Sequence, residues 1–423
     1  MSSPRITQKF AALQKQYDIS VHCNRCGFCE TACPTYVATG KETFSPRGRV
    51  QALRGIFEGK ITDPQAASEV FSTCLTCFAC TNVCFSEVPV GDLMGYARET
   101  ACGTILRPIG TFFLRFFLVH RKILSLFLWT AFFFKRLGVS FVLNKTGLLK
   151  VLSPELSAGE EIAGKVPLIF GANVNKKPPR INAEKKDLKV AYFSGCGMHY
   201  LYPGSAGSCL KLLEDNVREV AGINHSCCGL AAFTAGDPEG AKMLARKTLA
   251  QFAQTGADYI VTDDDSCCGF LLDYPKLLDN APQALEFSAK VKNLSDFLVE
   301  NGIAPAVTQS GRITYHDPCR MGNGQKSTAN PRIILRNIPS VDFVELEEAN
   351  WCCGGAGAYC LKHKELSDLV LERKLANIRE TKADKVITQA ASCLLHIGYG
   401  IRKKGWEKEI EVVHIADFLN DRE

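Results

Sequence analysis

The stretch Cys23-Asn-Arg-Cys-Gly-Phe-Cys-Glu-Thr-Ala-Cys-Pro34 decides how the N-terminal part of this chain folds. Its cysteines follow the spacing C-x2-C-x2-C-x3-C, and a second run with the same spacing comes later in the sequence. This spacing wraps a short segment around a cubane iron–sulfur cluster. The two runs are Cys23, Cys26, Cys29 and Cys33, and Cys74, Cys77, Cys80 and Cys84.

Two such runs predict two [4Fe-4S] clusters with exchanged fourth ligands. In twin motifs, three thiolates of one run bind one cluster and the fourth thiolate binds the other cluster. Zinc sites usually combine two C-x2-C pairs without a third cysteine at this spacing, which disfavours zinc knuckles. Pro34 follows the first run and Phe85 the second, a small departure because this residue shapes the turn and is not a ligand. The expected ligand sets are Cys23, Cys26, Cys29 and Cys84 for one cluster, and Cys74, Cys77, Cys80 and Cys33 for the other.

Composition restricts the class of protein. A chain of 423 residues is long enough for about two to three domains. Its 20 cysteines fall mostly in C-x2-C or Cys-Cys-Gly groups, which is typical of metal binding in a reducing compartment. The first ten residues lack the apolar segment of a secretory signal, so we expect a cytoplasmic protein. The net charge of +6 is modest, and no basic run interleaved with aromatic residues indicates nucleic-acid binding.

A helix is expected between the two cysteine runs. Residues 45–50 read Ser-Pro-Arg-Gly-Arg-Val, and Val50, Leu53, Ile56 and Phe57 then recur on one helical face. Arg47 and Arg49 either offset the negative charge of a thiolate-bound cluster or are solvated arginines at the start of the helix.

Residues 104–152 are rich in aromatic and aliphatic residues and contain regularly placed Arg and Lys. The longest run without charge, 123–134, has 12 residues, whereas a membrane-spanning helix needs about 20. We therefore expect two amphipathic helices with a basic rim. Such helices either lie in a membrane interface or form a hairpin packed on the next domain or a partner subunit. The number of Phe residues favours the membrane: Phe112, Phe113, Phe116, Phe117, Phe127, Phe132, Phe133 and Phe134.

The rest of the chain contains an internal duplication. Residues 153–188 are rich in Pro, Gly, Lys and Glu and are expected to be a linker. Each copy then has a β-branched run ending near a cysteine, a Cys-Cys-Gly, and a second such run with a further cysteine. Corresponding cysteines lie 123 to 126 residues apart. They are Cys196, Cys227, Cys228 and Cys267 in the first copy, and Cys319, Cys352, Cys353 and Cys393 in the second.

The pattern predicts an α+β multidomain protein. Each copy alternates strand-like runs with helical stretches, such as 241–253 and 366–378, which favours a small α/β domain with a parallel sheet. Its cysteines then gather at the carboxyl ends of the strands, where open α/β sheets usually place their sites. The predicted parts are a ferredoxin-like domain (1–103), basic amphipathic helices (104–152), the linker (153–188) and two cysteine-rich domains (189–305 and 306–423).

Each Cys-Cys-Gly repeat offers four thiols at one site. Adjacent cysteines can both direct sulfur at one metal when the following glycine lets the turn close. Four thiolates suit either a cubane cluster or a zinc ion, and the composition of the set does not choose between them.

The repeats resemble the cysteine-rich domain of heterodisulfide reductases and of the iron–sulfur subunits of several dehydrogenases. The stretches Cys26-Gly-Phe-Cys-Glu-Thr-Ala-Cys-Pro, Ser45-Pro-Arg-Gly-Arg, His316-Asp-Pro-Cys and Cys352-Cys-Gly-Gly-Ala-Gly-Ala-Tyr resemble most the iron–sulfur subunit of glycolate oxidase. Lactate-oxidising and anaerobic glycerol-3-phosphate dehydrogenases have similar subunits. The resemblance covers nearly the whole chain. It implies electron transfer from an FAD-containing partner subunit, which oxidises the 2-hydroxy acid, to quinone or another acceptor, and it implies no substrate oxidation by this chain alone.

The sequence also departs from the full repeat pattern, which ends in C-x2-C. Asp264 and Ala390 replace the first cysteine of that pair, so a five-cysteine site of the noncubane type is not expected. Cys268 lies beside Cys267, and either could be the ligand. His199 and His316 flank the first cysteine of each repeat and either orient a ligand or are structural. Cys102, Cys209 and Cys360 fit no motif and are expected to be buried thiols.

The two repeats are expected to differ in their metal. The second has Gly354-Gly-Ala-Gly after its paired cysteines, a flexible rim where a small acceptor could approach, so we expect a third, redox-active cluster there. The first has the crowded acidic segment Asp263-Asp-Asp, whose negative charge opposes reduction of a cluster, so a structural zinc ion or a cluster is expected.

Two other functions compete with the electron-transfer subunit. A heterodisulfide or disulfide reductase would act at a Cys-Cys-Gly cluster, but the fifth cysteines are missing. The iron–sulfur subunit of an anaerobic glycerol-3-phosphate dehydrogenase is the other alternative. No Gly-rich dinucleotide fingerprint follows a strand, so a flavin is expected on a partner. The expected location is peripheral, on the inner face of the cell membrane.

Overall fold

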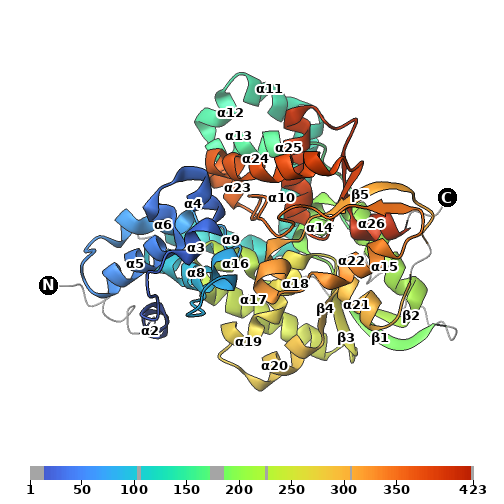
Figure 1. Cartoon of the computed structure of the whole chain (residues 1–423), viewed down its shortest axis with the longest axis horizontal. Coiled ribbons are helices and arrows are strands. Elements are labelled where there is room, and N and C mark those ends of the chain that lie inside the picture. The colour runs from blue at the N-terminus through green and yellow to red at the C-terminus, as the bar shows by residue number, and fades with distance from the viewer. Residues whose placement is uncertain (1–13, 102–105, 172–184, 224–226, 305–306, 421–423) are drawn as a thin grey trace.

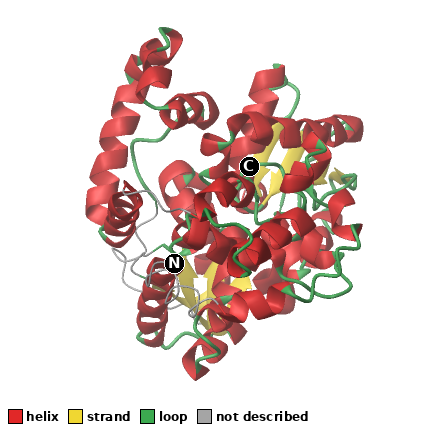
Figure 2. Ribbon diagram, turned by 90° about the vertical axis from the view of Figure 1, so that its left-hand side faces the viewer, coloured by secondary structure: helices red, strands yellow, loops and turns green. Residues whose placement is uncertain are grey.

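The N-terminal helices lie beside two α/β domains in the computed structural model, and a group of helices connects them (Figure 1). The structure describes residues 14–101, 106–171, 185–223, 227–304 and 307–420, with the backbone alone for 106–112. Both parallel sheets lie inside a layer of helices in the view of Figure 2. The order of parts along the chain is the one that the sequence predicts.

The first part is helical throughout. Its helix α5 (Pro46–Phe57) begins where Ser45 accepts a hydrogen bond from the Gly48 amide (2.9 Å), and Val50, Leu53 and Ile56 are buried as predicted. The other elements are α2 (Gln14–Ser20), α3 (Phe28–Thr31), α4 (Pro34–Thr39), η1 (Glu42–Phe44), η2 (Pro64–Ala67), α6 (Ser68–Ser72), α7 (Ala79–Asn82) and α8 (Val90–Ala101).

The apolar segment forms four helices where the sequence predicted two. They are α9 (Leu106–Val119), α10 (Arg121–Arg136), α11 (Val139–Lys145) and α12 (Leu148–Leu152). Gly138 and Gly147 adopt left-handed conformations (φ 79° and 78°) that only glycine takes readily, so each starts a new helix. The described parts of α9 and α10 meet at 103°, and the pair is therefore bent, not an antiparallel hairpin.

Within the described ranges, no single helix has the length and apolar character needed to cross a bilayer. The bent pair Phe113–Val119 and Arg121–Arg136 meets these criteria of length and composition when both helices are counted together.

The expected linker needs correction in its first part. Residues Pro154–Ala163 form α13, which begins with the Ser153 hydroxyl accepting a hydrogen bond from the Leu156 amide (3.2 Å). Ile162 packs into the core of the second repeat. This stretch shows little hydrophobic periodicity because the buried face of α13 consists of Ser157, Ala158 and Ile162, and two of these residues are small and weakly apolar. Residues 172–184 of the expected linker lie outside the described residues, and its end also needs correction because β1 begins at Lys186.

Each repeat contains a four-stranded, wholly parallel sheet. The first sheet has the order β2-β1-β3-β4, and the second has the matching order β6-β5-β7-β8. This equivalence confirms the duplication. The strands are β1 (Lys186–Phe193), β2 (Val217–Gly222), β3 (Tyr259–Thr262) and β4 (Val291–Asn293), then β5 (Gly311–Tyr315), β6 (Val341–Phe343), β7 (Lys385–Thr388) and β8 (Glu411–His414).

Helices cover both sheets, and the two predicted helical stretches lie within α17 and α24. The first repeat contains α14 (Cys196–Leu201), α15 (Pro203–Asn216), α16 (Leu230–Thr234), α17 (Pro238–Ala253), α18 (Asp265–Leu272), α19 (Tyr274–Leu277), α20 (Pro282–Ala289) and α21 (Leu294–Glu300). The second contains η4 (Arg320–Gln325), α22 (Ala329–Arg336), α23 (Tyr359–Lys362), α24 (Lys364–Thr381), α25 (Ala391–Lys404) and α26 (Ile415–Asn420).

Arg320 joins the three domains at one point. It belongs to the second repeat, and its guanidinium donates a hydrogen bond to Asp273 of the first repeat (2.9 Å). The same group lies over the ring of Phe78 from the ferredoxin-like domain (4.9 Å) and over that of Phe270 from the first repeat (5.3 Å). Both members of the ion pair are nearly buried, so their charges depend on each other.

Replacing Arg320 with Ala should lower the free energy of unfolding by about 3 kcal/mol, because Asp273 then stays buried without its arginine partner. Denaturant unfolding of the anaerobic holoprotein, followed by circular dichroism, measures the change. Arg336→Ala is the control, because its partner Glu345 and its own side chain are both exposed; it should cost less than about 1 kcal/mol. Equal effects of the two variants would contradict this role of Arg320.

Candidate metal centres

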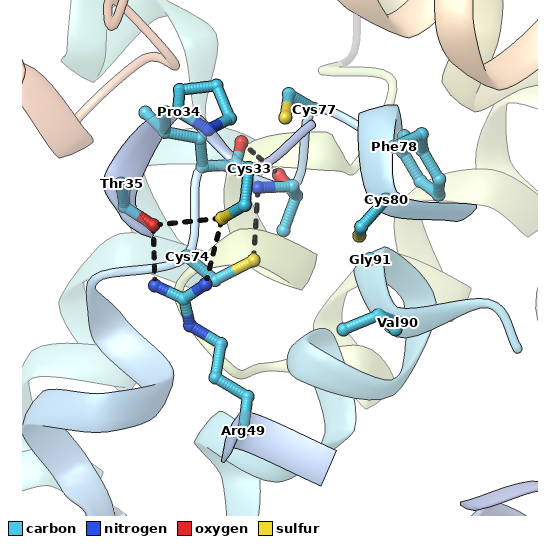
Figure 3. A pocket seen from close by; sticks show the side chains of 12 residues that line it. Cys33, Pro34, Thr35, Arg49, Cys74, Cys77, Phe78, Cys80, Val90 and Gly91 are labelled. Atoms are coloured by element: carbon cyan, nitrogen blue, oxygen red, sulfur yellow. Dashed lines mark hydrogen bonds between the residues drawn. The ribbon is translucent and has the colours of Figure 1, made fainter. Parts of the chain in front are cut away.

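The second predicted cluster set surrounds one hollow in the ferredoxin-like domain. Cys33, Cys74, Cys77 and Cys80 all line it, together with Pro34, Arg49 and Phe78. Figure 3 shows the four sulfur-bearing side chains around a common space, with Cys33 contributed by the other run. The thiol of Cys80 has its pKa raised well above the ordinary value by burial and by the nearby thiols of Cys77, Cys33 and Cys74. The structure therefore places the fourth cysteine of the first run with three cysteines of the second.

Arg49 supplies positive charge to this set. It is almost wholly buried, and its guanidinium lies 3.6 Å from the Cys33 sulfur and donates to the hydroxyls of Thr35 (2.9 Å) and Thr73 (3.2 Å), as Figure 3 shows in part. Burial opposes its charged form, but the nearby Cys74 and Cys33 thiolates outweigh burial and raise the pKa of Arg49. Of the two roles that the sequence left open, offsetting thiolate charge is the one that fits Arg49.

The first predicted cluster set lies next to it. Asn24 donates to the Ser86 hydroxyl (2.8 Å), and the rings of Phe28 and Phe85 make an edge contact at 5.2 Å. These contacts bring Cys84 beside the first run, and Cys23, Cys29 and Cys84 pack on the same core. Burial, together with Cys23 and Cys33, raises the pKa of Cys29 to about 11. Cys26 is exposed at the edge of the set.

Arg47 behaves differently from Arg49. Its guanidinium pairs with Glu30 (2.6 Å) and Glu42 (2.8 Å), both carboxylates. These two carboxylates neutralise most of the charge of Arg47 near the first set, and its side chain is also partly exposed.

The four thiols of the first repeat form one group. Cys196 interacts with Cys227, Cys227 with Cys228, and Cys228 with Cys267. Gly229 has φ 100°, which lets its amide turn back to the Cys227 sulfur (3.4 Å), as expected for Cys-Cys-Gly. Cys267 is thus the member of the pair that joins the set. Burial and the neighbouring carboxylates of Asp265 and Asp296 raise the pKa of Cys268, and none of the main groups that act on it within the described chain is a thiol. The sequence alone left this choice open.

The four thiols of the second repeat are arranged in the same way as those of the first, and a histidine lies beside them. The sulfurs of Cys319 and Cys352 lie 3.8 Å apart, and Cys353 interacts with both Cys352 and Cys393. His316 is fully buried, and its ring nitrogen lies within 4.8 Å of the sulfurs of Cys353 and Cys393. Within the described chain its nitrogens have no oxygen or nitrogen partner, so its neighbours are the thiols.

A lysine that the sequence analysis missed lies beside this set. Lys374 is fully buried on α24, and its ammonium donates to the carbonyls of Glu348 (2.5 Å) and Ala349 (3.2 Å), just before the paired cysteines. Burial lowers its pKa to about 8, while Cys353 acts in the opposite direction. The sequence around Lys374 does not reveal that it is buried, because an exposed lysine on a charged helix has the same sequence neighbours.

The ferredoxin-like domain and the second repeat meet at their thiols. Cys77 and Cys352 interact directly and share a small buried cluster with Leu75, Tyr359 and Val370. Hydrogen bonds hold this interface: Asn323 donates to the Cys77 carbonyl (3.2 Å) and Tyr359 to the Thr73 carbonyl (3.2 Å). A thiol of one predicted cluster set thus contacts a thiol of the next.

The two repeats also place their thiol sets near each other. Asp264 raises the pKa of both Cys267 in the first set and Cys393 in the second. Its carboxylate accepts bonds from the Ser266 amide (2.7 Å) and from the Ala391 amide of the other repeat (3.0 Å). The residue that replaces the fifth cysteine therefore caps α18 and fixes the interface between repeats.

The expected difference in access between the repeats is wrong. Gly354 and Gly355 are buried, and a Cβ on either would lie 2.7 Å from a backbone carbonyl, of Ser367 and Ser392 respectively. They permit close packing and do not form an open rim. In the first repeat, by contrast, Cys196 is exposed. The acidic triplet is buried, as expected for a crowded segment.

The donor sets fit iron–sulfur clusters. Each comprises four cysteines, and three of the four sets adjoin a buried or half-buried cation that no carboxylate neutralises directly. Thiolates with such partners are the ligands that cubane clusters require. Cys209 and Cys360 are buried in apolar cores, as predicted, and the core around Cys360 is the one that also contains Cys353 and Cys393. Cys102 lies outside the described residues.

Replacing Arg49 with Gln should make the potential of the adjacent cluster more negative by roughly 40–90 mV, or about 1–2 kcal/mol, because reduction adds negative charge near a lost cation. Redox titration monitored by EPR measures this shift. Arg54→Gln, on the same helix but paired with Glu58, should leave the potential unchanged. An unaltered signal in the Arg49 variant would refute the charge argument.

Comparison with known proteins agrees with this layout. A 4Fe-4S dicluster domain model matches residues 20–88, and a cysteine-rich domain model matches residues 190–272 and 313–398. The chain is 32% identical to a probable glycolate oxidase iron–sulfur subunit of Bacillus subtilis (strain 168), over 94% of this chain and 93% of that protein.

Two further relatives extend the comparison. The glycolate oxidase iron–sulfur subunit of Escherichia coli (strain K12) is 26% identical over 89% of each chain. Lactate utilization protein A of Shouchella clausii (strain KSM-K16) is 32% identical over its full length, which covers 56% of this chain. The twin cysteine runs, the duplicated parallel-sheet domains and the near-complete coverage show that this chain belongs to the family of glycolate oxidase iron–sulfur subunits.

Proposed function

We propose that this chain is the electron-transfer subunit of a flavin-linked 2-hydroxy-acid dehydrogenase of the glycolate or D-lactate type. It accepts electrons from a partner FAD subunit and passes them to quinone or another acceptor. The contact between Cys77 and Cys352 is the main support, because it joins two thiol sets from distant parts of the chain. Electrons can move between clusters only where their ligands come close.

The proposed cofactors follow the thiol sets. Two [4Fe-4S] clusters occupy the ferredoxin-like domain, one bound by Cys23, Cys26, Cys29 and Cys84 and the other by Cys33, Cys74, Cys77 and Cys80. A third cluster occupies the second repeat, bound by Cys319, Cys352, Cys353 and Cys393. The set of the first repeat, Cys196, Cys227, Cys228 and Cys267, has the same thiol arrangement and also fits a metal.

The rival functions lack such support. A disulfide-reducing subunit of the heterodisulfide type would want a fifth cysteine in each repeat, but Asp264 and Ala390 stand at those positions. The side chain of Asp264 is fully engaged in capping and interface bonds. No feature of the described residues favours glycerol 3-phosphate as the substrate of the complex.

We propose the membrane surface as a further partner. Beyond its contacts with α13 and the first repeat, α10 exposes large apolar side chains, and α11 continues this surface. Basic residues flank it, and burial of the aromatic residues together with attraction to anionic lipid would hold the chain at the inner face of the cell membrane. The exposed apolar residues are Leu126, Phe127, Trp129, Phe133, Phe134, Leu137, Phe141 and Val142.

Replacing Cys353 with Ser tests the electron route in the co-expressed complex. Quinone reduction by the 2-hydroxy acid should fall at least tenfold and one EPR signal should disappear. Reduction of an artificial dye that takes electrons from the flavoprotein should continue. Cys209→Ser, which removes a buried thiol from a core that contains no cysteine of the four sets, is the control and should keep all three properties. A Cys353 variant with every signal and full quinone reduction would disprove the route.

Replacing Phe127 and Phe134 with Ser tests membrane attachment. The variant should move from the membrane fraction to the soluble fraction, because it loses apolar burial in the bilayer interface. Fractionation of cell lysates followed by immunoblotting measures the distribution. Leu369→Ser removes a similarly exposed apolar residue from the second repeat and should have no effect. Complete release of the wild type by high salt alone would show that charge, not apolar burial, holds the protein.

A further inference from the structure

A hollow lies between the amphipathic helices and the thiols of the first repeat. Helices α9 and α10 contribute Leu118, Arg121 and Leu124, and the first repeat contributes the residues opposite. Only two of the four thiols of the repeat line it, so the hollow extends away from the metal set toward the helices. The residues of the first repeat that line it are Ser194, Cys196, His199, Tyr200 and Cys227.

On one side of the hollow, the guanidinium of Arg121 offers hydrogen-bond donors. The Arg121 guanidinium lies over the Tyr200 ring at 5.8 Å, and burial lowers the pKa of this arginine. The anionic groups that act on Arg121 within the described chain are Tyr200 and Cys196, and no carboxylate is among them. Tyr200 and the Cys196 thiol balance part of the charge of Arg121, and at the edge of the hollow its guanidinium can also donate to a carbonyl oxygen.

The other walls combine apolar and aromatic side chains with Ser194 and His199. Leu118 packs on the core of the first repeat, and Leu124 lies one turn beyond Arg121 on α10. Behind the hollow, Phe170 makes an edge contact with Tyr200 (5.1 Å) and Phe132 makes one with Phe170 (5.9 Å). The Tyr200 hydroxyl lies 3.1 Å from the Ser125 hydroxyl of α10, which holds this wall in place. Apolar walls with a few placed polar groups are typical of sites for small organic ligands.

We propose that this hollow binds the headgroup of a lipid-soluble quinone and that electrons leave the protein at the first repeat. The inference deepens the proposed function and rests on it. Arg121 donates to a quinone carbonyl oxygen, and the ring lies between Leu118, Leu124 and Tyr200. The quinone gains two electrons, supplied one at a time through the thiol-bound cofactors from the 2-hydroxy acid oxidised on the partner, and two protons from water to give the quinol.

The location favours a quinone over a small carboxylate. A carboxylate would add negative charge beside the thiols. Among the described residues, Arg121 is the one Arg or Lys in the lining, which otherwise consists of two leucines and the polar side chains of the first repeat. The helix that forms its wall also carries the exposed surface of Phe127, Phe133 and Phe134. A ligand dissolved in lipid would therefore reach the hollow along α10.

A quinone bound here requires the first repeat to carry electrons, although the sequence left a zinc ion or a cluster open for it. Cys196 is an exposed residue and borders the hollow, whereas Cys352 of the second repeat is buried in a cluster with residues of the ferredoxin-like domain. The first repeat must then hold a redox-active cluster, since a zinc ion could not pass electrons to the ligand. Asp264, which acts on thiols of both repeats, marks how closely the two sets approach.

Two variants test the site in the holoprotein. Arg121→Gln removes the donor, and Leu124→Trp fills the hollow. Lys122→Gln is the matched control, because it removes an exposed charge from the next position of α10. The first readout is labelling of the isolated holoprotein by a photoreactive azidoquinone, and the second is the KM for a short-chain quinone in detergent with the flavoprotein partner.

The expected result is at least a tenfold rise in the azidoquinone concentration needed for half-maximal labelling and a similar rise in KM for both variants. Dye reduction and the control variant should be unchanged. Labelling and KM that stay at wild-type values in both variants would overturn the site, as would displacement of the label by glycolate or acetate. If the wild-type complex reduces no quinone, the proposed function fails, whereas the labelling result decides the binding site separately.

Discussion

The structure depends on one electrostatic constraint: many thiolates must be held close together inside protein. Four sulfur ligands around a cluster bring net negative charge, and burying it requires compensation. Arg49 at the second ferredoxin set, Lys374 at the second repeat and Arg121 at the first repeat each place a cation there without a directly bonded carboxylate. Each cation comes from a helix, which fixes its position.

The same constraint explains where the domains touch. Contacts between the domains gather around the thiols. Cys77 meets Cys352, and the residue after Cys319 is Arg320, which joins all three domains. Asp264 links the two repeats at the position where a fifth cysteine would stand. An aspartate at that position therefore supplies a contact between the domains.

Duplication gave two similar folds, but their surroundings made them different. Both sheets have the same strand order, and both Cys-Cys-Gly turns close in the same way through a glycine with positive φ. The ferredoxin-like domain packs against Cys319 and Cys352 of the second repeat, and the amphipathic helices leave a hollow beside Cys196 and Cys227 of the first. Which repeat faces outward is a property of the assembly of domains, not of either repeat.

The sequence by itself determined the cysteine sets, the two parallel-sheet repeats and the amphipathic character of residues 106–152, because spacing and periodicity are local properties of the chain. It also predicted the crossing of Cys33 to the second run. Only the tertiary structure decided that Cys267 and not Cys268 joins its set, that His316 and Lys374 lie at the second set, and that Gly354 is packed and not open. These features depend on contacts between residues far apart in the sequence, and local patterns do not record which distant side chain fills a given space.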